Sequence, residues 1–315
     1  MRRLNVAMLF MALCLNLSAA EPNLKERSWS KTYKLSSVWQ TIAVENRHGT
    51  LRIETWDRKE AKIDVIIRAS ADKESDIESL LSVVDIKSEE TDRKISAETR
   101  ITDRIKFYGK GNKPKHSVTI DMTVTLPATQ PLTAINSFGP LQLGDHEGPV
   151  ELTSKFGSMK AGKLLLVTKI LVEFGELDLS FVKGGDIEVK FSKGEIRQAA
   201  GDIDLKLSFS KDVTVGMTPE LKSFDVKASY SDVYLEMPAG FDADFDITTK
   251  FGDFRNRTRA EIREQADANG EKSSIPSSIR THRFTGKSGN GGIPVKARTD
   301  FGDIILKDRV GGVSS

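Results

Sequence analysis

Cysteine is nearly absent from this 315-residue sequence, in which Cys14 is the only one. A single thiol excludes a disulfide framework within the chain and every metal site that needs several thiolates.

An excess of one charge is also missing, because 47 Lys and Arg balance 45 Asp and Glu to a formal charge of +2. A dedicated nucleic-acid-binding protein carries a large basic excess. We therefore expect no nucleic-acid partner.

Long apolar runs are absent except at the N-terminus. Arg2 and Arg3 precede an apolar run from residue 4 to residue 17, which is followed by Ser18-Ala19-Ala20. This pattern predicts a signal peptide over residues 1–20 that is cleaved after Ala20, and the run is short for a bilayer span. We expect an exported protein in the periplasm or at the cell surface, with no transmembrane segment in the mature chain. Cleavage removes two basic residues and Cys14, which leaves 45 residues of each charge and no cysteine.

An aromatic residue, often followed by glycine, recurs about every 18 residues. The strands that precede these positions alternate apolar and polar residues, as in Ile203, Leu205 and Leu207 before Phe209. Period-two alternation predicts half-buried strands, so we expect each aromatic ring to face the interior. We expect the following glycine to supply the positive φ of a turn. The structural repeat positions are Phe138, Phe156, Phe174, Phe191, Phe209, Tyr230, Phe251 and Phe301.

The repeat length predicts the architecture. A unit of about 18 residues is two short strands joined by two turns, and it can bury its apolar face only by stacking on its neighbours. A β-solenoid, similar to a parallel β-helix, would place the aromatic residues in an internal column. An antiparallel meander is the alternative, but it needs a cover for one apolar face, and the repeat region contains no helical segment to provide it. We predict an all-β solenoid.

The remaining segments divide the chain. Residues 21–130 are expected to form a strand-helix-strand region continuous with the solenoid, which then occupies residues 131–315. Ile77, Leu80, Leu81 and Val84 have helical spacing and predict a short amphipathic helix near residues 72–84. Residues 256–292 are polar and lack strand periodicity, so they are predicted to be an irregular basic insertion.

Candidate motifs for chemistry are incomplete. Gly286-Lys287-Ser288 lacks the earlier glycine of a phosphate-binding loop, because that position is Thr281. Asp242, Asp244 and Asp246 resemble the start of a calcium loop, but Ile247 occupies the position that requires glycine. The four histidines have no metal-ligand spacing. The sequence predicts no catalytic residue, no metal site and no cofactor.

Charge is unevenly distributed along the chain. Ten basic and four acidic residues lie between Arg255 and Arg298. Such a segment suits anionic envelope glycans or lipid headgroups, although it could equally dock on acidic strand faces of the same protein. The candidate binding loop comprises Arg255, Arg257, Arg259, Arg263, Arg280, Arg283 and Lys287.

Two segments carry a family resemblance. The opening segment Gly49-Thr50-Leu51-Arg52-Ile53 and the closing segment Phe301-Gly302-Asp303-Ile304, together with the Phe-Gly repeats, resemble the bacterial exported putative-adhesin family, whose domain is toastrack-like. The resemblance implies a β-solenoid in the cell envelope without catalytic residues. The expected function is non-enzymatic binding of an envelope protein or an anionic polysaccharide. The alternative is a polysaccharide-active enzyme on a solenoid scaffold.

Overall fold

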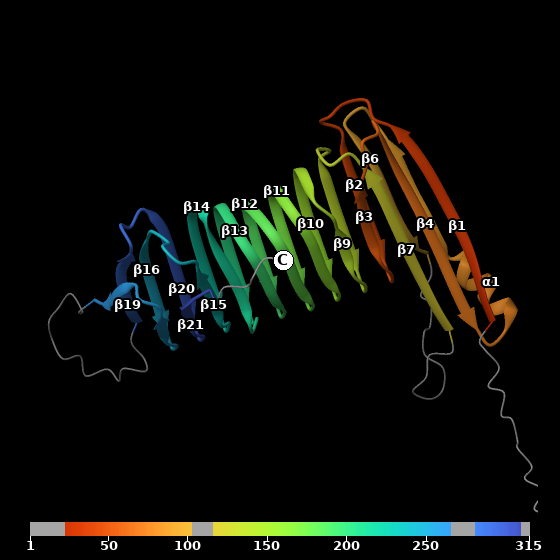
Figure 1. Cartoon of the computed structure of the whole chain (residues 1–315). Helices are drawn as coiled ribbons and strands as arrows, with labels where there is room; N and C mark the ends of the chain where they lie inside the picture. The colour runs from red at the N-terminus through yellow and green to blue at the C-terminus, as the bar shows by residue number, and fades with distance from the viewer. Residues whose placement is uncertain (1–22, 103–115, 266–280, 310–315) are drawn as a thin grey trace, which may run out of the picture.

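The computed structural model describes residues 23–102, 116–265 and 281–309, so the expected signal peptide lies outside it. The described residues form 21 β-strands and one α-helix, which confirms the all-β prediction. Figure 1 shows the strands side by side along one long axis, with the N-terminal strands at one end and the C-terminal strands at the other. No helix in the described part of the chain is long and apolar enough to cross a membrane.

Most consecutive elements are joined by short connections. The N-terminal part comprises β1 (Asn23–Lys34), β2 (Thr41–Arg47), β3 (Leu51–Thr55), β4 (Glu60–Ala71), α1 (Glu74–Ser82), β5 (Val84–Glu90), β6 (Lys94–Ile101) and β7 (His116–Leu126). The regular repeats comprise β8 (Leu132–Ser137), β9 (Leu141–Leu143), β10 (His146–Lys155), β11 (Ser158–Glu173), β12 (Glu176–Lys190), β13 (Lys193–Ser208), β14 (Val213–Ser229) and β15 (Val233–Met237). The C-terminal part comprises β16 (Ala243–Lys250), β17 (Phe254–Arg257), β18 (Glu261–Glu264), β19 (Thr281–Ser288), β20 (Ile293–Asp300) and β21 (Ile304–Asp308).

The strands pair in two rows, which we call sheet A and sheet B. Sheet A has the order β5-β6-β2-β8-β10-β11-β12-β13-β14-β20-β16-β19-β18. Sheet B has the order β1-β4-β7-β3-β9-β11-β12-β13-β14-β15-β21-β17. The long strands β11 to β14 belong to both sheets, sheet B through their first halves and sheet A through their second halves. Successive repeats pair in parallel, so the chain is a solenoid and the antiparallel meander is wrong.

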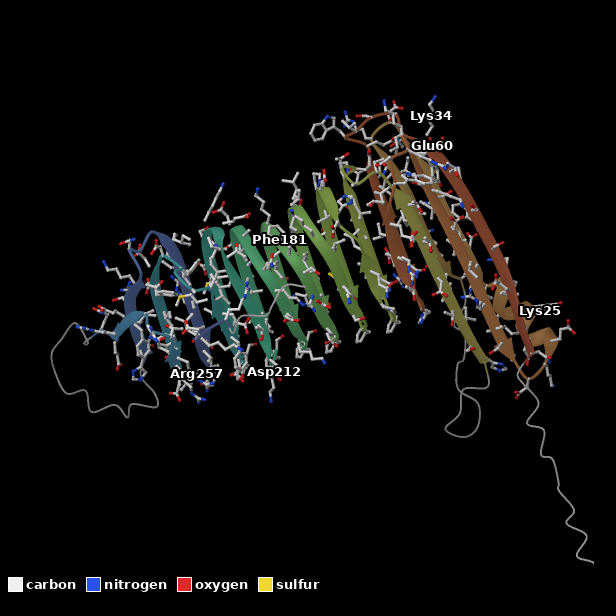
Figure 2. The ribbon with its side chains drawn as sticks, viewed as in Figure 1. Lys25, Lys34, Glu60, Phe181, Asp212 and Arg257 are labelled. Atoms are coloured by element: carbon white, nitrogen blue, oxygen red, sulfur yellow. The ribbon has the colours of Figure 1, made fainter. Side chains whose placement is uncertain are left out.

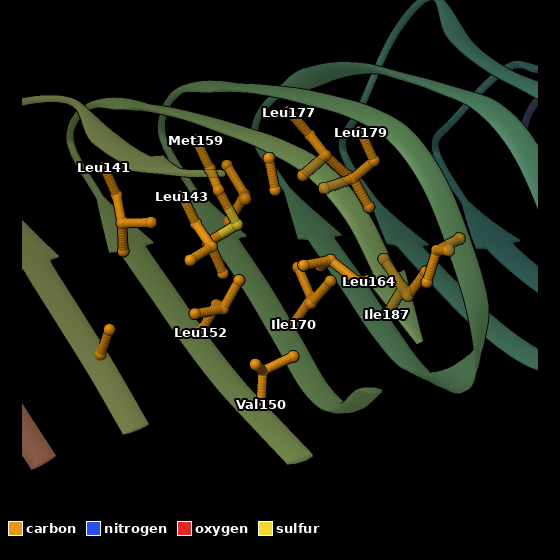
Figure 3. Close-up of a cluster of buried hydrophobic side chains, with 14 of the residues drawn as sticks. Leu141, Leu143, Val150, Leu152, Met159, Leu164, Ile170, Leu177, Leu179 and Ile187 are labelled. Carbon is orange, nitrogen blue, oxygen red and sulfur yellow. The ribbon is translucent and has the colours of Figure 1, made fainter. Parts of the chain in front are cut away.

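Alternating side chains from both sheets fill one continuous core. Figure 3 shows leucine, isoleucine, valine and methionine side chains of neighbouring coils packed between the two layers. Leu152, Ile170 and Ile187 occupy equivalent register positions on adjacent strands and are at most 1% exposed. The predicted alternation of apolar and polar residues along each strand is therefore correct, because the residues next to these three in the sequence face solvent.

The aromatic residues do not lie in this core. The eight repeat aromatics are 38–52% exposed, and each has a left-handed φ between 49° and 61°. Together with His48 they form an external stack, which we call the aromatic column, with neighbouring ring centroids 4.5–5.1 Å apart. The predicted internal column is wrong because the positive φ redirects the side chain at the point where the strand ends.

The glycines that follow the aromatic residues also have a role other than the expected one. None of Gly139, Gly157, Gly175, Gly252 or Gly302 has a positive φ. A Cβ at each would lie 1.9–2.1 Å from a backbone carbonyl oxygen of the neighbouring coil. Glycine is therefore required by the close approach of stacked backbones. On the opposite side of the coil, Gly184, Gly185 and Gly201 do have positive φ, within strands that bend without a separate turn.

Helix α1 agrees with the sequence prediction, whereas residues 256–292 differ from it. Helix α1 lies where the helical spacing predicts it and buries Ile77 and Leu80. The stretch over residues 256–292 is not irregular throughout, because it contains β18 and β19, which pair with each other and extend sheet A beyond β16. Phe284 is half-buried against Phe254, with ring centroids 5.1 Å apart, so this added hairpin covers the end of the core.

The last repeat is displaced from its sequence order. Strand β20 pairs with β14 on one side and β16 on the other, and β21 lies between β15 and β17. Phe301 accordingly stacks between Tyr230 and Phe251. The final repeat is thus inserted between two repeats that are consecutive in the sequence.

Candidate functional site

The six candidate binding residues that the structure describes do not form a single patch; Arg280 lies outside the described residues. Arg255 and Arg257 belong to β17 in sheet B, whereas Arg263, Arg283 and Lys287 belong to β18 and β19 in sheet A. In Figure 2, Arg257 lies at the C-terminal end of the solenoid and Lys25 beside α1 at the other end. The C-terminal basic residues are therefore distributed over both sheets.

Part of the basic segment pairs with acidic side chains of the same protein. Arg283 contacts Asp246 through Nε and Nη2, at 2.9 and 3.0 Å, and Arg255 contacts Asp303 at 2.9 Å. The hydrogen bond from Arg283 holds the pKa of the Asp246 carboxyl group below its usual value. These two arginines therefore pair with acidic residues of the same protein, which is the alternative that the sequence left open.

The aspartates that resemble a calcium loop each have another role. Asp242 accepts a hydrogen bond from the Asn290 amide and Asp244 accepts one from the Gly292 amide, both at 2.8 Å. These bonds hold the loop that leads into β20. Within residues 23–102, 116–265 and 281–309, no group of three or more His, Cys, Asp and Glu could hold a metal ion.

A second group of cations is brought together only by the fold. Lys206, Lys227 and Arg298 occupy one register line across the adjacent strands β13, β14 and β20, and all three are exposed on the outer face of sheet A. We call this group the basic row. Because adjacent strands are about 4.8 Å apart, three like charges follow one another at that spacing.

The basic row is only partly neutralised. Arg298 lies 3.7 Å from the Asp225 carboxylate. Lys206 and Lys227 have no ion pair within 4.0 Å among the residues that the structure describes. Beyond Arg298, the register continues through Thr248 to Arg283, which is paired with Asp246.

The sequence contains a signal that identifies the basic row. Each of its members lies three residues before a repeat aromatic, namely Phe209, Tyr230 and Phe301. Equal distance from the aromatic position means equal register in a solenoid. Analysis of charge along the chain misses the row because Arg298 is 71 positions after Lys227 in the sequence.

No family model matches this chain, and no curated protein matches it. Among solved structures, a putative cell adhesion protein from Clostridium sporogenes has 14% identity and a TM-score of 0.29, covering 90% of this chain and 100% of its own. A putative adhesin from Bacteroides fragilis has 11% identity and a TM-score of 0.39, with coverage of 89% and 97%. A putative lipid binding protein from Parabacteroides distasonis has 12% identity and a TM-score of 0.38, with coverage of 89% and 96%.

All three TM-scores are below 0.5, so these structures carry no argument about a site or a ligand. The described chain is an all-β solenoid. Two of the three solved bacterial proteins are named as an adhesin or a cell adhesion protein.

Proposed function

We propose that this protein is an exported, non-enzymatic binding protein that holds an anionic polysaccharide of the cell envelope on the outer face of sheet A. The observation that carries the proposal is the basic row of Lys206, Lys227 and Arg298. The N-terminal signal pattern supports export, with cleavage after Ala20.

The energetics of the basic row support a binding role. Like charges directly opposite each other on neighbouring strands are destabilising. Two such pairs are present, Lys206 with Lys227 and Lys227 with Arg298, and only Arg298 has a carboxylate within 4.0 Å among the described residues. A bound polyanion would remove this repulsion, so ligand binding and stability are coupled.

The shape of the face favours a linear polymer. The outer surface of sheet A is an open array of strands, and the row crosses three of them in a straight line. Charge complementarity along such a line selects ligands of negative charge. The attraction weakens when salt is added, because salt screens exposed charges. An uronic-acid polymer has carboxylates along an extended chain and fits these requirements.

The test compares binding to polygalacturonate and to uncharged dextran. The purified mature protein is expected to bind polygalacturonate and not dextran, and the double variant Lys206→Thr/Lys227→Thr is expected to bind about tenfold more weakly, which corresponds to ~1.4 kcal/mol. The same variant should be equally or more stable, since like charges in register are removed.

A matched control removes two lysines from the opposite sheet. Lys160→Thr/Lys193→Thr lowers the net charge equally but leaves sheet A unchanged, because both residues pair within sheet B. Equal loss of binding in both double variants would contradict the basic row as the site. Shortening of the polymer by the purified protein would contradict the non-enzymatic role.

A separate experiment tests export. Envelope fractionation of the producing bacterium is expected to recover the protein with Glu21 as its first residue. Recovery in the cytoplasm with Met1 retained would contradict export without affecting the polysaccharide measurement.

A further inference from the structure

A cleft of about 610 Å³ lies at the C-terminal end of the solenoid, on the side opposite the aromatic column. Four chain segments meet there: the β15–β16 loop, the turn before β18, the end of β19 and the end of β21. In the regular repeats this side is closed by the continuous strands β11 to β14. The inserted coil of β20 and β21 has no such continuous strand. The cleft therefore follows from the displaced order of the last repeat.

The inner part of the cleft is apolar. Met237 and Phe241 line it and are 7% and 3% exposed, and both belong to the hydrophobic core cluster. Pro238 and Ala260 add apolar wall from two different segments. The floor of the cleft is therefore formed by side chains of the hydrophobic core.

The outer part of the cleft carries three cations and two carboxylates. Arg259, Lys287 and Arg309 line it together with Glu261 and Asp308. Arg309 is fixed, because its guanidinium donates to the Arg197 carbonyl and lies 3.9 Å from a Glu236 carboxylate oxygen. Arg259 and Lys287 form no ion pair within 4.0 Å with any described carboxylate, although Glu261 and Asp244 are the cross-strand neighbours of Lys287.

We propose that this cleft binds an organic carboxylate with an apolar body, whose hydrocarbon part packs on Met237 and Phe241 and whose carboxylate meets Arg259 and Lys287. Ligand sites are typically concave, mostly apolar and about 300–1,000 Å³ in volume, with a few polar groups that fix orientation. Charge-assisted hydrogen bonds to a carboxylate are the stronger ones that such groups make. The site is separate from the basic row, which lies on the outer face of sheet A.

Calorimetric titration of the full chain with octanoate and dodecanoate tests the proposal, at ligand concentrations below micelle formation. Dodecanoate is expected to bind more tightly than octanoate, because more apolar surface is buried. Acetate, which supplies only the carboxylate, and dodecyltrimethylammonium, which reverses the charge, are each expected to bind at least about tenfold more weakly.

Two sets of variants locate the site. Ala239→Trp should fill the cleft from an exposed loop position and abolish dodecanoate binding. Arg259→Gln/Lys287→Gln should weaken dodecanoate binding about tenfold and leave the thermal midpoint unchanged. Arg257→Gln, an exposed arginine on the adjacent strand β17 that does not line the cleft, is the matched control and should bind normally.

The results that would contradict a carboxylate site in the cleft differ from those that would contradict polysaccharide binding. Equal affinity for dodecanoate and dodecyltrimethylammonium would show non-specific association of the tail. Undiminished dodecanoate binding by folded Ala239→Trp would place the ligand elsewhere. Neither result bears on Lys206→Thr/Lys227→Thr.

Discussion

At the residue scale, the Phe-Gly pair combines two separate requirements. The aromatic position takes the left-handed conformation, which costs an L-residue roughly 1–2 kcal/mol. Stacking with the rings of both neighbouring coils, at 4.9 and 4.7 Å for Phe174, contributes roughly 0.5–1.5 kcal/mol per pair and offsets that cost. The next position must lack a Cβ, because the adjacent backbone occupies its place. The order of the two residues therefore follows from stacking and close approach.

Truncation of one ring measures the value of the aromatic column. Phe174→Ala is expected to destabilise the protein by about 2 kcal/mol, because the ring is 47% exposed and its loss removes two stacking contacts. An internal ring would cost about 3–5 kcal/mol, as we expect for Phe224→Ala, where the ring is 1% exposed. Denaturant unfolding of both variants gives the comparison. Phe174→Gly should be about 1 kcal/mol less destabilised than Phe174→Ala, because glycine accepts the left-handed φ.

The glycine that follows the ring is expected to be far more sensitive. A Cβ at Gly175 would lie 1.9 Å from the Gly157 carbonyl oxygen. Gly175→Ala should therefore lower the unfolding free energy by more than about 4 kcal/mol or prevent folding. Gly144→Ala is the control, since an added Cβ there meets no atom within 4 Å, and it should change stability by less than about 0.5 kcal/mol. Similar thermal midpoints for the two variants would contradict the backbone contact.

At the element scale, strand β10 begins with a buried histidine that fixes the preceding connection. Nε2 of His146 lies 2.9 Å from the Gln130 carbonyl oxygen, and Nδ1 has no hydrogen-bond partner among the described residues. The side chain is 0% exposed, and burial lowers the pKa of its imidazole. The neutral ring, with its proton on Nε2, is therefore the form that the folded chain holds.

The direction of the resulting pH dependence follows from linkage. Above the unfolded pKa of about 6.5 the ring is neutral in both states and its full contribution to stability is present. As pH falls below that value, the unfolded state binds a proton that the folded state does not. Unfolding free energy should therefore fall towards lower pH, by at most about 1.4 kcal/mol per pH unit for this group.

Urea unfolding between pH 7.5 and 5.5 measures this loss. His146→Gln keeps a donor for the Gln130 carbonyl without a group that titrates, so its stability should fall less over the same range. A residual loss is expected in the variant, because burial and Arg47 also lower the pKa of His48. Identical slopes for the variant and the wild-type chain would contradict the role of His146.

Elements with strong alternation could be predicted from the sequence, and others could not. Ile203, Leu205 and Leu207 alternate strictly and all are buried. The same parity fails at Phe209, because a left-handed residue ends the alternation and turns its side chain outwards. Strand β19 has only half-buried and exposed positions before its last residue, Ser288. An edge hairpin of this kind has little apolar periodicity to detect.

At the scale of the whole molecule, sequence order and spatial order differ. The repeat predicts stacked coils, since equal spacing gives equal register. It does not specify which coils are neighbours, because similar motifs recur along the chain. The position of β20 between β14 and β16 also explains why the basic row could not be assembled from local charge alone.

Cysteine crosslinking tests the displaced order. Ser229 and Asp300 are register partners on β14 and β20, and both are exposed. Ser229→Cys/Asp300→Cys, in the mature chain that lacks other cysteines, should therefore form an intramolecular disulfide under mild oxidation, which peptide mapping detects.

The control pairs Ser229 with the corresponding residue of the next repeat in the sequence. Lys250 is the partner of Asp300 on the other side, so its Cα lies two strands from that of Ser229, about 9–10 Å away. A disulfide requires Cα atoms within about 7 Å, and Ser229→Cys/Lys250→Cys should remain reduced. The opposite pattern would indicate coils stacked in sequence order.

The position of the last repeat also sets the order in which the chain can fold during synthesis. Coils up to β15 can stack as they emerge, because each binds to a predecessor that already exists. Strands β16 and β17 emerge next but have no parallel partner, since their places in sheets A and B adjoin β20 and β21. The edges of β14 and β15 therefore stay open until residue 308 has been made. Completion of the solenoid is a single late event, in which the final repeat joins two parts that were synthesised before it.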